Sequence, residues 1–144
     1  MKGIFWDLMI MILTLGIFIG IVPVTFSMVG ETFRIDARIN VEEIVGIINF
    51  LESSPTKTQQ SYFLPKSECL LTIKNYDGFA IVNLTVKMPY GERNQTAIGY
   101  PIIPDNVQIV SNEEGIMCSD SGEKRIFIQR CENEITITET EVNC

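Results

Sequence analysis

The sequence contains no histidine, and its 11 basic residues are scattered along the chain rather than clustered. Histidine is the commonest general base and the commonest transition-metal ligand, so its absence removes the usual centre of catalytic and metal chemistry. Nucleic-acid binding needs a stripe of lysine and arginine that displaces counterions from phosphates, and a net charge of −7 without such a stripe disfavours it. The sequence therefore predicts no cofactor, no metal and no nucleic-acid partner.

Motifs of catalysis and of small-molecule binding are absent as well. The chain has no glycine-rich phosphate loop, no nucleophile elbow and no spacing typical of a paired-metal site. Its serines lack an activating base, and acidic pairs such as Glu42-Glu43 and Glu113-Glu114 are typical of solvated surfaces. The sequence predicts a protein that is not an enzyme and has no small-molecule substrate.

A long uncharged segment is the most prominent feature that the sequence does have. Residues 8–30 contain no Asp, Glu, Lys or Arg. An apolar run of more than about 18 residues can cross the hydrocarbon core of a bilayer as a helix with all internal backbone groups hydrogen-bonded. Pro23 removes one helical hydrogen bond and predicts a kink. Gly16 and Gly20 either let another helix approach closely or reflect the frequency of glycine in membrane helices. The expected partners are the membrane and other helices.

A second helical pattern follows the uncharged segment. Apolar residues recur at helical spacing over residues 40–51, namely Val41, Ile44, Ile47, Ile48 and Leu51. Asn40 and Glu43 resemble a capping pair, so this amphipathic helix either begins afresh at Asn40 or continues the preceding one with a bend. Ser53-Ser54-Pro55 should end it, because the residue before proline is pushed out of the helical region.

After a polar linker the apolar residues alternate, which is typical of strands. Cys69, Leu71 and Ile73 share one strand face, and a second strand has one apolar face made by Ala80, Val82, Leu84, Val86 and Met88. Further short strands are expected near residues 107–110, 115–118, 125–129 and 134–138. The pattern predicts an α+β protein whose small antiparallel sheet or sandwich packs on the amphipathic helix. The expected segments are residues 1–30, 31–54 and 55–144.

Four cysteines lie after the uncharged segment, and none forms a CxxC pair, so two disulfides are favoured over a metal site. Disulfides persist in oxidising compartments, so the cysteines predict that residues 55–144 lie outside a membrane. The charges that flank the uncharged segment do not by themselves decide its orientation. Three pairings are possible. If the last three strands form a meander, Cys144 returns to Cys118 and Cys131 is left for Cys69.

Asn83 and Asn94 stand in Asn-x-Thr sequons and are candidate glycan acceptors, with Asn83 on the outward face of its strand.

The stretch from Gly3 to Ile12, continued to Gly16 and Pro23, resembles the N-terminal segment of type IV pilins and pseudopilins. The resemblance implies a short basic leader ending in glycine, cleavage between Gly3 and Ile4, an acidic residue at Asp7 and a helix break at Pro23. It also implies a long N-terminal helix whose second half packs on a β-domain, as in small archaeal pilin-like proteins of the cell surface. Asp7 itself has two readings: its carboxylate either stays at the headgroup level at the start of the helix, or neutralises the terminal amine of a neighbouring subunit in a dry helical bundle.

Asp7 departs from the family pattern in two ways, because it lies one residue closer to the expected cleavage point and is Asp instead of Glu. The resemblance therefore implies a minor, tip or accessory subunit instead of a major filament subunit. A second hypothesis is a permanently anchored accessory or binding domain of a surface motility or adhesion complex. A third is a secretory signal cleaved near Thr25-Phe26-Ser27.

Overall fold

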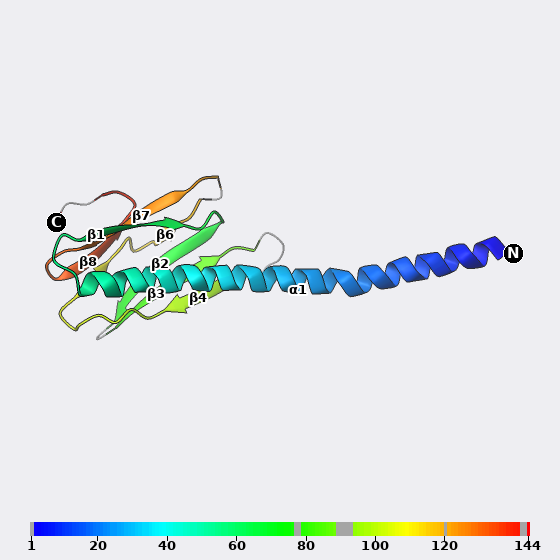
Figure 1. The fold of residues 1–144 in the computed structure, drawn as a ribbon, viewed down its shortest axis with the longest axis horizontal. Coiled ribbons are helices and arrows are strands. Elements are labelled where there is room, and N and C mark those ends of the chain that lie inside the picture. The colour runs from blue at the N-terminus through cyan, green and yellow to red at the C-terminus, as the bar shows by residue number, and fades with distance from the viewer. Residues whose placement is uncertain (1, 77–78, 89–93, 120, 142–143) are drawn as a thin grey trace. The chain divides into compact units, whose positions relative to one another are not determined.

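The structure is a computed structural model that describes residues 2–76, 79–88, 94–119, 121–141 and 144, with residues 2–5 and 26 described by their backbone alone. One helix, α1, is assigned without interruption over Lys2–Glu52 and includes Pro23 (Figure 1). The chain forms two units, Met1–Thr32 and Phe33–Cys144, and each is described by itself. The helix passes through Asn40 instead of beginning there, while the kink at Pro23 stays a prediction.

The unit Phe33–Cys144 contains two four-stranded sheets, which confirms the predicted α+β class. Sheet A has the strand order β1-β7-β8-β5, and sheet B has the order β4-β3-β2-β6. The strand pairs are antiparallel, as predicted, except for β5–β8, which is parallel. The strands are β1 (Gln59–Leu64), β2 (Cys69–Tyr76), β3 (Phe79–Val86), β4 (Gln95–Gly99), β5 (Gln108–Val110), β6 (Ile116–Met117), β7 (Lys124–Arg130) and β8 (Glu134–Thr138).

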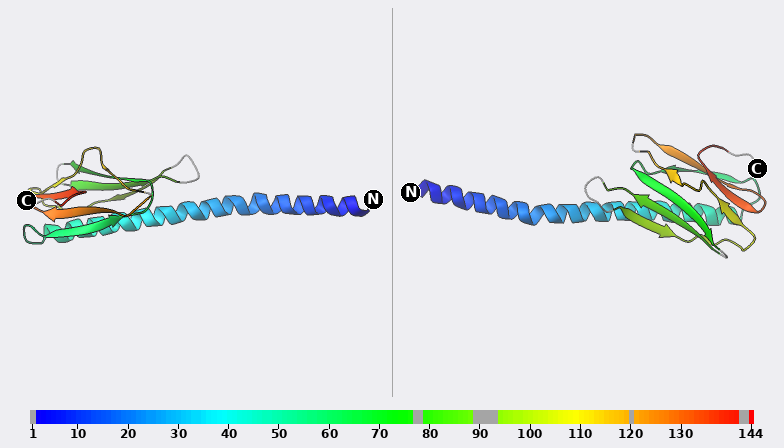
Figure 2. Two further views of the ribbon diagram at one scale, coloured as in Figure 1. Left: turned by 90° about the horizontal axis from the view of Figure 1, so that it is seen from above. Right: turned by 180° about the vertical axis from the view of Figure 1, so that it is seen from behind.

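The inner faces of the two sheets share one apolar core, and Figure 2 shows the sheets as separate layers. Alternation along β3 puts Ala80, Val82, Leu84 and Val86 inside, as their spacing predicts. On sheet A the strands β7 and β8 contribute Ile126, Ile128, Ile135 and Ile137, each with 0% exposure. Apolar side chains that leave water in this number supply the main driving force for folding the domain.

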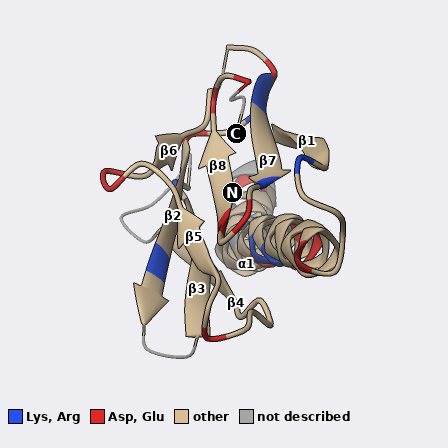
Figure 3. Cartoon of the chain, turned by 90° about the vertical axis from the view of Figure 1, so that its left-hand side faces the viewer, with Lys and Arg blue, Asp and Glu red and all other residues tan. Residues whose placement is uncertain are grey.

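The second half of α1 completes this core beside strands β1 and β4 (Figure 3). Its buried side chains follow the predicted helical spacing and are Ala37, Val41, Ile44, Ile48 and Leu51. Glycine at position 99 lets β4 come close, because a Cβ there would lie 2.5 Å from Val41 Cγ1 and 2.7 Å from Val45 Cγ2. The helix therefore closes the side of the sandwich between the two sheet edges.

Polar contacts tie the same part of the helix to both edges. The Tyr62 hydroxyl of β1 lies 2.6 Å from Asn40 Oδ1 and 2.9 Å from Glu43 Oε2. Burial raises the pKa of Tyr62 well above its usual range, and the hydrogen bond to Glu43 and its negative charge raise it further. Beyond β4, the backbone N–H of Ile102 donates to Asn49 Oδ1 at 2.7 Å. Asn40 and Glu43, which resembled a cap, thus bind a strand instead.

The helix ends at Glu52, as Ser53-Ser54-Pro55 predicts. The hydroxyls of Ser53 and Ser54 both donate to the carbonyl oxygen of Phe50, at 3.0 and 2.7 Å. These bonds satisfy a carbonyl that the helix itself leaves without an amide donor.

The two predicted disulfides are present, but the expected pairing is wrong. Cys69 is bonded to Cys118, and Cys131 is bonded to Cys144. The last three strands do not form a meander, because β6 belongs to sheet B while β7 and β8 belong to sheet A. Cys118 follows β6 beside β2, where its N–H donates to the carbonyl of Cys69 at 2.8 Å. The chain beyond β8 instead returns to the end of β7, where Cys131 lies.

Candidate functional site

The uncharged part of α1 is the first candidate site. All described side chains of residues 6–29 are exposed within their unit, although most of them are large and apolar. This helix is long and apolar enough to cross a membrane. The 23 uncharged residues 8–30 would extend about 34 Å as an α-helix, compared with roughly 30 Å of hydrocarbon core.

The hydroxyl groups of the two threonines in this segment are satisfied by the helix itself. The Thr14 hydroxyl donates to the carbonyl of Ile10 at 2.7 Å, and the Thr25 hydroxyl lies 2.8 Å from the carbonyl of Val22 and 3.1 Å from that of Ile21. An unpaired hydroxyl would be costly in hydrocarbon, so these bonds make both threonines compatible with lipid. The segment requires no outside partner for these two groups.

The residues expected to guide assembly occupy two sides of the helix. At about 100° per residue, Gly16, Gly20 and Pro23 lie within an arc of about 60°, whereas Asp7 lies about 180° from Gly16. A Cβ added at Gly16 or at Gly20 would meet no other atom within 4 Å, so this face is open. The carboxylate and the small-residue face therefore cannot contact the same side of one neighbouring helix.

The expected processing residues Gly3 and Ile4 belong to the first turn of α1, whose first residue is Lys2. The structure describes the backbone of both residues but not the side chain of Ile4. Nothing in the fold tests cleavage between them, so processing stays a prediction.

Both sequon asparagines lie on sheet B. Asn83 occupies the middle of β3, between Thr72 of β2 and Ile98 of β4, and its side chain is half-buried. Asn94 immediately precedes β4 and is exposed. The threonines of the two sequons, Thr85 and Thr96, are paired across β3 and β4 with their hydroxyl oxygens 3.4 Å apart.

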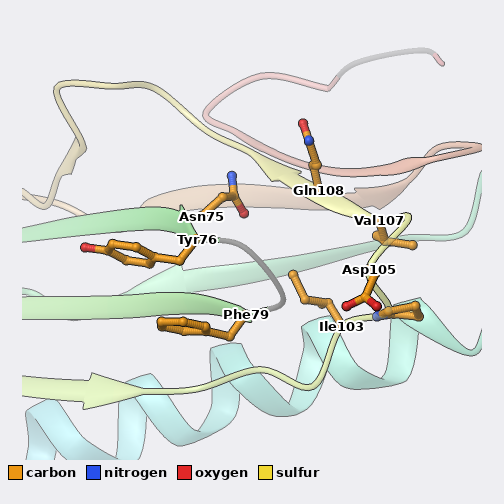
Figure 4. A pocket seen from close by; sticks show the side chains of 8 residues that line it. Asn75, Tyr76, Phe79, Ile103, Asp105, Val107 and Gln108 are labelled. Carbon is orange, nitrogen blue, oxygen red and sulfur yellow. The ribbon is translucent and has the colours of Figure 1, made fainter.

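A hollow of about 630 Å³ lies where β2 and β3 approach the segment that precedes β5 (Figure 4). The rings of Tyr76 and Phe79 stack with their centroids 5.0 Å apart, and Asp105 supplies a carboxylate. Asn75 is already engaged, since its amide donates to the Ile109 carbonyl at 2.5 Å and accepts from the Ile109 N–H at 3.1 Å. Its described lining residues include no serine, threonine or cysteine nucleophile, so they offer no pair of nucleophile and base.

The described part of the structure contains no candidate metal-binding site. Among the described residues, no group of three or more histidine, cysteine, aspartate or glutamate side chains could hold a metal ion. All four cysteines are engaged in the two disulfides.

Comparison of the chain with protein-family models, with curated proteins and with solved structures finds no match.

Proposed function

We propose that this protein is a non-enzymatic, pilin-like subunit of the cell surface. Its uncharged helix anchors it in the membrane and then joins a bundle of similar helices, while the disulfide-containing β-domain is displayed outside. The observation that carries the proposal is the uncharged helical segment, since the described apolar side chains of residues 6–29 are exposed. Such a surface requires either lipid or other helices to cover it.

Three further features support the proposal. Gly16 and Gly20 leave one face of the segment open to a neighbouring helix. Asp7 precedes the uncharged run, where its carboxylate can meet the new terminal amine that cleavage after Gly3 would create in a neighbouring subunit. The two disulfides suit a domain that lies in an oxidising exterior, where asparagine glycosylation also takes place.

The mature N-terminus tests the proposal. Mass spectrometry of the protein purified from the membranes of its own host should find a chain that begins at Ile4. A Gly3→Leu variant should keep residues 1–3, and a Gly46→Ala variant, changed at an open position of the same helix, should be cleaved normally.

A permanently anchored accessory domain is the competing function. A photo-cross-linking amino acid at Phe18 should capture copies of this chain or other pilin-like helices if the proposal is correct. An uncleaved chain that cross-links to a single unrelated envelope protein, and never to such helices, would contradict the proposal and support the accessory domain instead.

A further inference from the structure

We infer that Asn94, and not Asn83, carries an N-linked oligosaccharide, and that this oligosaccharide lies along a groove on the outer face of sheet B. The inference rests on the proposed function in one respect, which is that the domain faces the exterior.

The groove is formed by two neighbouring rows of outward-facing side chains. The first row crosses all four strands of sheet B in register, from Thr96 through Thr85 and Leu70 to Met117. The second row runs beside it through Asn94, Lys87 and Glu68, and the backbone N–H of Lys87 donates to the Glu68 carbonyl at 2.8 Å. Together they border a groove of about 490 Å³. Four strands span about 14 Å at the usual spacing, which gives a short chain of sugars room to lie flat.

The lining of the groove suits a saccharide. Leu70 is half-buried and Met117 is 69% exposed, so the floor offers apolar contacts to the C–H face of a sugar ring. The side chains of Lys87 and Glu68 form an ion pair at the border, where they can bind hydroxyl groups. β3 and β4 contain no Lys, Arg, Asp or Glu and are tan in Figure 3, so the charged residues that line the groove are Lys87 and Glu68 at its border. Leu70 and Met117 are apolar residues outside the core on this face, and a covalently attached sugar would cover them.

The two asparagines differ in access. Asn94 is exposed, precedes its strand and lines the groove. Asn83 lies in a strand that is paired on both sides, and its Oδ1 atom is buried without a hydrogen-bond partner among the described residues. A transferase must reach the side-chain amide, and the central strand β3 cannot leave its ladder without breaking backbone hydrogen bonds on both sides. Gln95 and Thr96 of the other sequon lie in β4, which is an edge strand paired on one side. Modification of the folded domain is therefore expected at Asn94 alone.

The reaction requires a lipid-linked oligosaccharide phosphate as the donor, together with its membrane transferase. Asn94 Nδ2 attacks the anomeric carbon of the first sugar, and a C–N bond forms. The bond between that carbon and the phosphate oxygen breaks, and the lipid phosphate leaves with the electron pair. One amide proton passes to a base of the transferase, so the asparagine remains an amide and no redox change occurs.

Glycopeptide mapping of the full chain from its own host tests the assignment. The peptide with Asn94 should carry the sugar, and the peptide with Asn83 should have its unmodified mass. Asn94→Gln and Thr96→Ala should each remove all glycan, whereas the matched variants Asn83→Gln and Thr85→Ala should retain it.

Met117 tests the position of the sugar, because its oxidation by peroxide should be severalfold slower in the glycosylated protein than in Thr96→Ala. Met88, which lies outside the groove, should oxidise equally in both.

An unmodified Asn94, or a glycan on Asn83 alone, would overturn the assignment. Equal oxidation of Met117 in both proteins would overturn the placement of the sugar in the groove. Failure of the inference is distinguishable from failure of the proposed function. A chain that begins at Ile4, contains both disulfides and lacks a glycan at Asn94 contradicts only the inference. A cytosolic chain with four reduced cysteines contradicts both.

Discussion

Among single residues, Tyr62 shows how one hydroxyl joins a strand to the helix. Its single proton is shared between Asn40 Oδ1 and Glu43 Oε2, both on α1. Tyr62→Phe should lower the free energy of unfolding by about 1–2 kcal/mol at neutral pH, because it leaves both acceptors without this donor. Urea unfolding of the full chain in detergent measures the loss. A variant as stable as the native protein would show that these contacts contribute nothing.

The raised pKa of Tyr62 predicts a pH dependence with a defined sign. A phenol whose pKa is higher in the folded state stabilises the fold fully below its unfolded pKa of about 10, and this contribution declines as the pH rises beyond that value. The difference in unfolding free energy between the native protein and Tyr62→Phe should therefore shrink above about pH 10. A constant difference up to strongly alkaline pH would contradict this account.

Gly99 offers a test of the contact between β4 and the helix. Gly99→Ala would put a Cβ 2.5 Å from Val41 Cγ1, and valine side chains have little rotamer freedom in a helix to move away. The expected loss is about 1–3 kcal/mol in the free energy of unfolding. Gly46→Ala is the matched control, since nothing lies within 4 Å of its added methyl group. The control should gain about 0.5–1 kcal/mol, because alanine favours a helix interior over glycine.

At the scale of elements, helix α1 contains two segments with different surroundings. Ile17→Arg combined with Phe18→Arg puts two charges in the uncharged segment, at a cost of about 2.5–3.5 kcal/mol each for membrane insertion. The double variant should move from the carbonate-washed membrane pellet towards the soluble fraction. Ile102→Arg, at a domain residue with 79% exposure, should leave the fractionation unchanged. Full retention of the double variant in the pellet would contradict a membrane anchor.

Local patterns predicted the helical elements, whereas several strands depended on the tertiary structure. Residues 8–30 and the stripe through Ile44 and Ile48 could be read directly, because charge and helical spacing are properties of neighbouring residues. Strand β1 was missed, since Leu64 is its one fully buried side chain and the others do not alternate. Strand β4 was missed because its inward positions are Ala97 and Gly99, which are small where the helix packs against them.

For the candidate site too, some features follow from the local sequence and others depend on the tertiary structure. The positions on α1 could be inferred from the sequence, since Gly16, Gly20 and Pro23 share a face of any regular helix. The groove beside Asn94 could not, because it requires the register of four strands that span residues 69–117. The disulfide pairing failed for a similar reason. Which cysteines meet depends on the sheet that each strand joins, and no local pattern specifies that choice.

For the whole molecule, the two disulfides should stabilise the fold to different extents. Cys69 and Cys118 are 49 residues apart, whereas Cys131 and Cys144 are 13 apart. Loop-closure entropy gives roughly 4 kcal/mol for the first and roughly 3 kcal/mol for the second. Unfolding of the paired alanine variants measures these losses, and non-reducing peptide mapping checks the pairing. A larger loss for the Cys131–Cys144 pair, or peptides joined in another combination, would contradict this prediction.

The shared helix also determines how mechanical tension reaches the domain. Residues 37–51 of α1 fill part of the domain core, so this part of the helix belongs to the folded domain itself. Tension applied along it would be borne by the packing of Val41, Ile44 and Ile48. Extraction of this helix under force would remove part of the core, so detachment and unfolding of the domain are one event.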